Sequence, residues 1–146
     1  MKTLYYNITD TLSNLKDIPL LLLRLILAYG FYEPAMMKIK DTQSIVEWFT
    51  STGIPMPTLN AYLVTYTEFL GFIFLAIGFA TRIISIPLII AMIVAIKVAH
   101  WENGFSASEN GYEIALYYII MLITLLFNGA GRISVDFLID KKMRNK

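Results

Sequence analysis

Seven polar side chains lie within or beside the long apolar runs of this chain, where each is costly to keep. They are Arg24, Glu33, Glu68, Lys97, His100, Asn110 and Glu113. A charged side chain at the centre of a bilayer costs about 3 kcal/mol or more, so such residues pair with one another or bind a ligand or a proton. Lys97 and His100 are one helical turn apart, and histidine exchanges a proton near neutral pH. These residue types predict a ligand or proton site, although none of them can be assigned as catalytic from the sequence.

Several kinds of chemistry are excluded by composition. The chain has no cysteine, which removes disulfides, thiolate nucleophiles and cysteine-bound clusters. His100 is the single histidine, so we predict no metal site and no haem held by two histidines of one chain. No phosphate-binding glycine loop or Ser–His–Asp order is present, and a net charge of +1 offers no nucleic-acid surface. We predict no intrinsic cofactor, so redox chemistry would need a bound quinone or a partner protein.

Four apolar runs must position these residues. The chain is too hydrophobic for an ordinary soluble domain, with 57% apolar residues among 146 and a mean hydropathy of +0.61. Lipid offers no partner for open backbone groups, so helices are favoured over isolated strands. The predicted spans cover about residues 18–37, 57–80, 83–101 and 111–127. The predicted fold is therefore all-α, an integral membrane four-helix bundle embedded in the lipid bilayer.

The charge distribution predicts how the bundle is oriented. With four spans both termini share one side, which would hold eight lysines and arginines against two in the opposite loops, Lys38 and Lys40. The positive-inside rule then places both termini in the cytoplasm, with the bundle in the bacterial inner membrane. We divide the chain into a cytoplasmic segment (1–17), a transmembrane domain (18–138) and a basic cytoplasmic tail (139–146) that meets anionic headgroups.

The outward loop 39–56 is predicted to contain a short amphipathic helix. Apolar residues there alternate with polar ones at helical spacing, and they include Ile45, Trp48 and Phe49. We expect this helix to lie at the membrane interface with Trp48 at headgroup depth. The alternative is that it covers the outer mouth of the bundle.

The predicted spans also fix the depth of each candidate residue. Five lie in the outer third, namely Glu33, Lys97, His100, Asn110 and Glu113. Glu68 falls near the middle and Arg24 in the inner half. A carboxylate at the depth of Glu68 should face the interior and pair with Arg24, Lys97 or a tyrosine, Tyr62 or Tyr66. Two interpretations stay open: an ion pair that only fixes helix register, or a site for a ligand or a proton.

Seven short pieces of the chain, in order and spacing, resemble the DoxX family of small four-helix bacterial membrane proteins. They are LLRL (22–25), GIP (53–55), EFLG (68–71), GFATR (78–82), HWENGF (100–105), NGYE (110–113) and GAGRISVD (129–136). The resemblance covers about residues 18–138 and implies the four-span topology. The family usually has Gly-Pro-Gly where this chain has Gly129-Ala130-Gly131. This departure affects the end of a helix more than any candidate site. Relatives are associated with thiosulfate oxidation coupled to quinone reduction, with oxidative-stress membrane complexes and with copper-linked gene clusters.

Three hypotheses for function follow. The first is a subunit of a redox-linked membrane complex, with a polar pocket in the outer half of the bundle that holds a quinone or another small amphipathic ligand. This subunit would be accessory to an oxidoreductase, with other membrane or periplasmic proteins as partners, because no self-contained catalytic motif is present. The second is a non-enzymatic membrane adaptor. The third is a small-solute or metal-ion carrier, which the absence of an evident internal repeat disfavours.

Overall fold

The computed structural model describes residues 15–144, which fold into helices and their connecting loops without a β-strand. The all-α prediction is confirmed for these residues. Most of the predicted N-terminal segment (1–14) and the end of the predicted tail (145–146) lie outside the described residues.

The helices follow the apolar runs closely. The first run forms α2 (Asp17–Lys40), the loop 39–56 contains α3 (Thr42–Ser51), and the second run forms α4 (Pro57–Ile77). The third run forms α5 (Thr81–Ala95), which continues through a π-helical turn η1 (Ile96–His100) and a 3-10 turn η2 (Trp101–Asn103). A second 3-10 turn, η3 (Ala107–Glu109), precedes α6 (Glu113–Asn128), and α7 (Val135–Arg144) closes the described chain.

Three of these helices are long and apolar enough to cross a membrane: α2, α4 and the continuous helical stretch Thr81–Asn103. The fourth, α6, is equally apolar but has 16 residues. At ~1.5 Å per residue it covers about 24 Å, somewhat less than the ~30 Å of hydrocarbon in a typical bilayer. The chain is thus a helical membrane protein, and a fourth full span stays a prediction.

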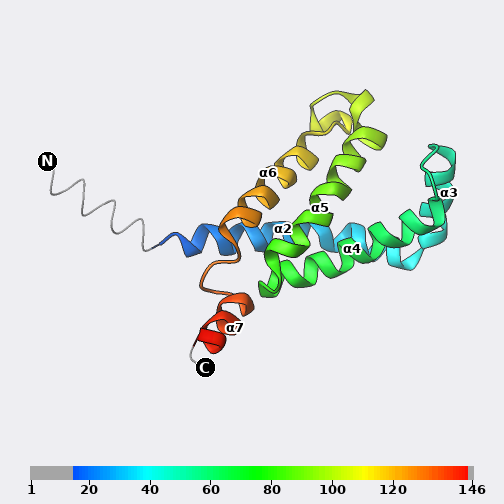
Figure 1. The fold of residues 1–146 in the computed structure, drawn as a ribbon. Coiled ribbons are helices and arrows are strands. Elements are labelled where there is room, and N and C mark those ends of the chain that lie inside the picture. Colours follow the sequence, from blue (N-terminus) through cyan, green and yellow to red (C-terminus); the bar gives the residue numbers. More distant parts are fainter. Residues whose placement is uncertain (1–14, 145–146) are drawn as a thin grey trace, which may run out of the picture.

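The helices form two antiparallel pairs that cross each other (Figure 1). One pair is α2 with α4, and the other is the hairpin of α5 with α6. The pairs meet around a core that includes Leu27, Phe31, Leu75, Leu88 and Leu122. Away from this core the tip of the α5/α6 hairpin diverges from α3 (Figure 1). We call the end that carries α3 and η1 to η3 the loop end, and the opposite end the terminal end.

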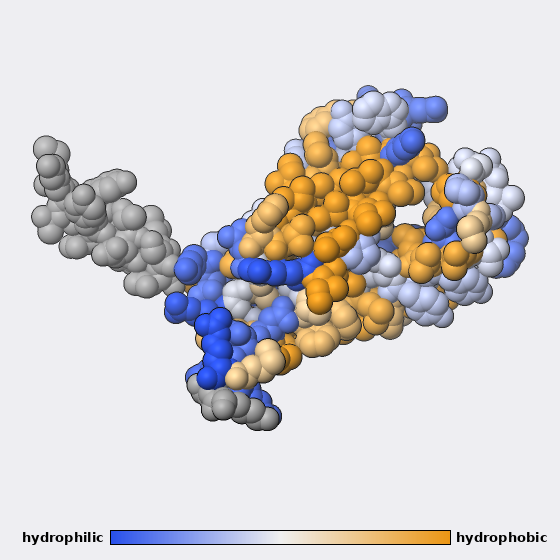
Figure 2. Space-filling model, viewed as in Figure 1, coloured by the Kyte–Doolittle hydropathy of each residue, from blue (hydrophilic) through white to orange (hydrophobic). Residues whose placement is uncertain are grey.

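The outer surface of the α5/α6 hairpin is strongly apolar, as Figure 2 shows. Its exposed residues include Ile83, Ile86, Ile90, Ile120 and Phe127. Such a large exposed apolar surface is what lipid contact requires and what water would disfavour. The sparse interior core is explained in the same way, because most apolar side chains face the bilayer.

Candidate functional site

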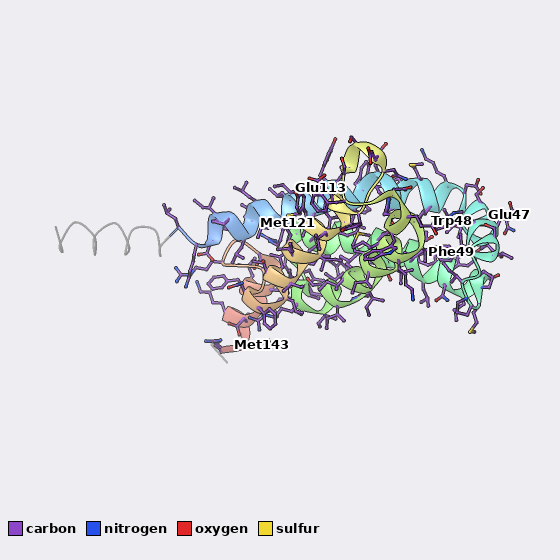
Figure 3. All side chains as sticks on the ribbon, turned by 90° about the horizontal axis from the view of Figure 1, so that it is seen from above. Glu47, Trp48, Phe49, Glu113, Met121 and Met143 are labelled. Atoms are coloured by element: carbon purple, nitrogen blue, oxygen red, sulfur yellow. The ribbon has the colours of Figure 1, made fainter. Side chains whose placement is uncertain are left out.

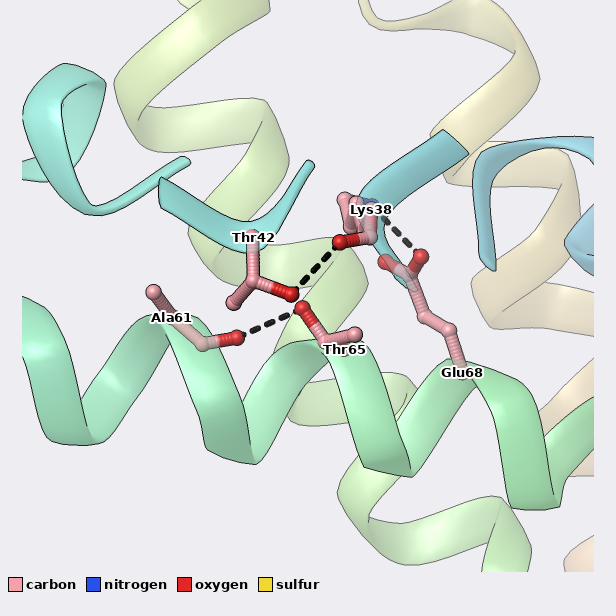
Figure 4. Close-up of polar contacts among 5 residues, drawn as sticks. All are labelled: Lys38, Thr42, Ala61, Thr65 and Glu68. Atoms are coloured by element: carbon pink, nitrogen blue, oxygen red, sulfur yellow. Dashed lines mark hydrogen bonds and ion pairs between the residues drawn. The ribbon is translucent and has the colours of Figure 1, made fainter. Parts of the chain in front are cut away.

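A buried ion pair joins α2 to α4 (Figure 4). The Nζ of Lys38 lies 2.5 Å from Oε2 of Glu68, and the two side chains are 23% and 3% exposed. One turn before Glu68, buried Thr65 donates a hydrogen bond to the carbonyl of Ala61 at 2.7 Å. Thr42 donates to the carbonyl of Lys38 at 2.7 Å, so the first turn of α3 is fixed against the residue that carries the ammonium. Helices α2, α3 and α4 therefore meet at this pair.

The prediction that Glu68 faces the interior is confirmed, and the prediction of its partner is wrong. The expected partners were Arg24, Lys97 or a tyrosine, whereas the structure pairs Glu68 with Lys38. Lys38 was assigned to the outward loop because the apolar run ends one residue earlier. The helix in fact continues to Lys40, which carries the long lysine side chain back onto α4.

The exposed side of this region is a shallow hollow at the end of α2. It is lined by Glu33, Met37, Lys38 and Asp41 among others, and Glu33 is exposed. Asp41 is the N-cap of α3, since its carboxylate accepts hydrogen bonds from the Oγ of Ser44 at 2.5 Å and from its backbone N–H at 3.1 Å. These hydrogen bonds favour the ionised carboxylate and hold the pKa of Asp41 below its usual range.

His100 lies at the tip of the α5/α6 hairpin, at the end of the π-helical turn. Its Nδ1 is 2.8 Å from the backbone carbonyl oxygen of Asn110. A carbonyl only accepts hydrogen bonds, so Nδ1 carries the proton and the neutral ring keeps a lone pair on Nε2. The residue is partly exposed, and Nε2 is the ring nitrogen that this contact leaves for another partner. The single histidine is thus held in one tautomer by the loop that follows it.

The loop opposite His100 is tightly built. Asn110 has a left-handed backbone (φ 60°), and its carbonyl also accepts a hydrogen bond from the side chain of Asn103 at 3.2 Å. Gly111 leaves no room for a side chain, because a Cβ there would lie 2.7 Å from the backbone of Phe105. Asn110 therefore acts through its backbone, and the Asn-Gly sequence is explained by local geometry.

Glu113 caps this same loop. Its Oε2 accepts a hydrogen bond from the backbone N–H of Ala107 at 3.0 Å, and its Oε1 accepts one from the hydroxyl of Tyr117 at 2.9 Å. Both carboxylate oxygens are engaged. Beside it, the rings of Trp101 and Tyr112 stack with their centroids 5.6 Å apart. At the hairpin tip, His100 thus lies in a loop that is held together by hydrogen bonds and stacked aromatic rings.

The structure divides the seven predicted residues into three places. The hairpin tip and its approach hold Lys97, His100, Asn110 and Glu113; the α2/α4 pair holds Glu33 and Glu68; and Arg24 lies towards the terminal end. Figure 3 labels Glu113 on the hairpin, well separated from Trp48 on α3, and Figure 1 shows the same divergence. The seven residues therefore do not form one site, and a polar pocket in the outer half of the bundle stays a prediction.

Arg24 is fully buried near the terminal end. Its Nη2 donates a hydrogen bond to the carbonyl of Ile133 at 2.5 Å, and its Nη1 lies 3.5 Å from the carbonyl of Leu75. Gly78, which ends α4 with φ 69°, packs against the guanidinium so closely that a Cβ would collide with it. The residue therefore joins the end of α4 to the segment between α6 and α7.

Asp136 completes this junction and was missed as a functional candidate. Its carboxylate accepts hydrogen bonds from the backbone N–H groups of Ala80 at 2.7 Å and Thr81 at 3.0 Å, which begin α5. Ala80 has φ 47°, a strained conformation for a residue with a Cβ, and the hydrogen bond to Asp136 holds it. The two partners are 56 and 55 residues from Asp136, so no local pattern could reveal the contact.

The comparisons with known proteins cover most of the chain. The profile of the DoxX family matches residues 19–101, which span α2 to the start of η2 and include His100. The chain belongs to the DoxX family. It is 30% identical over 132 residues to a Haemophilus influenzae protein named "Uncharacterized protein", a match that covers 85% of each chain.

Two further relatives match over nearly their whole length. A second Haemophilus influenzae protein with the same printed name is 30% identical over 137 residues, or 91% of this chain and 99% of the relative. A Bacillus subtilis protein named "Putative oxidoreductase CatD" is 25% identical over 129 residues, or 88% of this chain and 92% of the relative. No solved structure matches the chain. Within residues 15–144 the DoxX fold brings no three metal-ligating side chains together.

Proposed function

We propose that this DoxX protein is an accessory subunit of a redox-linked complex in the bacterial inner membrane, and that its loop end binds a quinone-type headgroup beside His100. In this proposal α6 completes a four-helix bundle, α3 lies at the outer membrane interface, and both termini are cytoplasmic. The similarity to a relative named as an oxidoreductase supports the redox link.

The observation that carries the proposal is the fixed tautomer of His100. With Nδ1–H donating to the carbonyl of Asn110, the lone pair on Nε2 can accept the proton of a quinol hydroxyl. When the ring is doubly protonated, Nε2–H can instead donate to a quinone carbonyl. A loop that holds Nδ1 and leaves Nε2 for a ligand suits repeated proton exchange at the membrane surface.

In this proposal the electrons of the quinol pass to a partner subunit. The chain has no cysteine, and residues 15–144 contain no cluster of metal ligands, so oxidation of a quinol requires a redox-active group in a partner subunit. Other side chains at the hairpin tip support the ligand. Lys97 is exposed one turn before His100 and contributes positive charge, while Glu113 keeps the loop in shape.

Fluorescence of Trp101 tests this proposal, because that residue follows His100 directly. In a Trp48→Phe background Trp101 is the remaining tryptophan. We expect a short-chain quinone to quench it saturably in detergent, and His100→Ala to weaken binding about tenfold, as loss of one hydrogen bond to a charged or strongly polar group would. Glu102→Gln, an exposed neighbour, is the matched control and should keep the affinity. Unsaturable quenching, or equal affinity in both variants, would contradict the proposal.

A non-enzymatic adaptor is the second candidate. It is favoured by the Lys38–Glu68 pair and the Arg24 junction, which use their charges within the chain and join helices together. An adaptor should keep its partner proteins in a folded Glu68→Gln or His100→Ala variant and bind no quinone. Co-purification of partners with and without quinone depletion therefore separates the two functions.

A further inference from the structure

The terminal end contains a hollow of about 910 Å³ bounded by the start of α2, the start of α5, the end of α6 and one face of α7. Apolar side chains line it further along the helices, namely Leu20, Leu23 and Ile83. Basic side chains line it nearer the helix ends, namely Lys16, Arg82, Arg132 and Arg144. The lining thus has the amphipathic character of a phospholipid, with positive charge beside apolar surface.

Two of these four cations are already paired. Arg132 Nε lies 3.6 Å from Asp17, and Arg144 Nε lies 3.0 Å from Asp140. The carboxylate of Asp136, also at the hollow, is engaged by backbone amides. Among residues 15–144, neither Lys16 nor Arg82 forms an ion pair, and the four cations of the lining outnumber its three carboxylates by one, so the hollow keeps a net positive charge.

Arg82 is held in place at this hollow. One of its terminal nitrogens donates a hydrogen bond to the carbonyl of Phe127 at 3.2 Å, which orients the exposed guanidinium towards the last turn of α6. A guanidinium has five N–H donors in a planar fork, so most of them are left for an anion. Ile83, the next residue, is 72% exposed and continues the apolar surface into the lipid-facing side of α5.

We propose that this hollow binds the phosphate headgroup of an anionic phospholipid. Arg82 and Lys16 contact the phosphate oxygens, and the acyl chains leave along Leu20, Leu23 and Ile83. The terminal end carries the excess of lysine and arginine that predicts a cytoplasmic surface, which is where anionic headgroups are attracted by basic side chains. Charge-assisted hydrogen bonds to phosphate are short and strong, so a fixed arginine selects an anionic headgroup.

Native mass spectrometry of the intact protein with added phosphatidylglycerol tests this site. We expect the wild-type chain to retain one phosphatidylglycerol in preference to phosphatidylcholine. Arg82→Gln should lower the affinity for phosphatidylglycerol about tenfold, Lys16→Gln should lower it less, and Arg82→Lys should restore part of it. Lys141→Gln removes the same charge from α7 outside the hollow and is the matched control, which should bind as the wild type does.

Three results would overturn the proposal. Equal loss in Lys141→Gln and Arg82→Gln would show diffuse attraction to a basic surface. Equal retention of phosphatidylcholine and phosphatidylglycerol would show that the charge of the headgroup does not determine binding. Displacement of the lipid by inorganic phosphate would identify a site for free phosphate rather than lipid. The thermal midpoint of each variant checks its folding, and Lys16→Gln, whose side chain is exposed, keeps the test decisive if Arg82→Gln unfolds.

Discussion

The two partners of the Lys38–Glu68 ion pair differ in burial, and this difference decides how much stability is lost when either one is replaced. Glu68 is almost completely enclosed, whereas a quarter of the Lys38 side chain reaches the surface. A lysine that loses its partner can extend towards water, but a carboxylate in the helix interface cannot. The cost of breaking the pair should therefore depend on which residue is replaced.

We predict that Lys38→Gln destabilises the protein by about 3–5 kcal/mol and that Glu68→Gln costs clearly less. The double variant Lys38→Met with Glu68→Leu should recover most of the loss, because it leaves no buried charge. Unfolding in mixed detergent and denaturant measures all three. If Glu68→Gln is the more damaging single variant, the carboxylate has a role that the pair alone does not explain.

Asp41 provides a pH dependence outside the membrane-spanning helices. Hydrogen bonds from Ser44 lower the pKa of Asp41 from 3.8, so the folded state binds its proton less readily than the unfolded state does. The contribution of this cap is complete above pH 3.8 and is lost as the pH falls through the lower folded value. The protection factors of the α3 amides, which correct for the intrinsic exchange rate at each pH, should therefore fall below about pH 4. In Asp41→Asn this fall should be absent; its persistence would place the titration elsewhere.

Helix α7 is attached to the α4–α5 turn through Asp136, whose carboxylate accepts hydrogen bonds from the amides of Ala80 and Thr81 and whose backbone N–H donates to the carbonyl of Gly78 at 2.9 Å. Asp136→Ala leaves the amides of Ala80 and Thr81 without an acceptor, at a cost of about 1–3 kcal/mol. Asp136→Asn keeps one oxygen and should cost less. The loss should appear as a lower thermal midpoint and faster trypsin cleavage at Lys141 and Lys142. Asp140→Ala, whose carboxylate contacts Arg144 on the same helix, is the control and should change neither.

The apolar runs were sufficient to predict the helices but not their contacts. Composition and span length placed α2, α4, α5 and α6 to within a few residues, because lipid leaves few alternatives to a helix. The end of α2 was harder to predict, because the helix continues beyond the apolar run to Lys40. The available signal was Asp41 followed by Ser44, which marks the start of α3 and so allows α2 to last to Lys40. The contact of Asp136 with the start of α5 depends on tertiary structure and has no local signature.

The two crossed helix pairs separate the polar residues that their predicted depths grouped together. Depth follows from position in a span, but helix rotation and tilt are set by packing. The hairpin of α5 and α6 diverges from α3 (Figure 1), and His100 at the end of η1 lies on a different helix pair from Lys38 and Glu68, which join α2 to α4.

The proposed orientation is tested by labelling, because the chain has no cysteine. A Ser108→Cys variant places a thiol at the loop end, and a Met143→Cys variant places one on α7; both positions are exposed. We predict that a membrane-impermeant maleimide labels the first in intact cells and the second only after lysis. Labelling of both, or of Met143→Cys alone, would show that the termini are not cytoplasmic.

Native mass spectrometry of the protein extracted gently from its own membrane tests whether a quinone is bound beside His100. We predict a partner subunit and a bound mass of quinone size, with His100→Ala losing the quinone and keeping the partner. A chain that carries a stoichiometric partner but no small ligand, identically in wild type and His100→Ala, would contradict the quinone site and identify an adaptor.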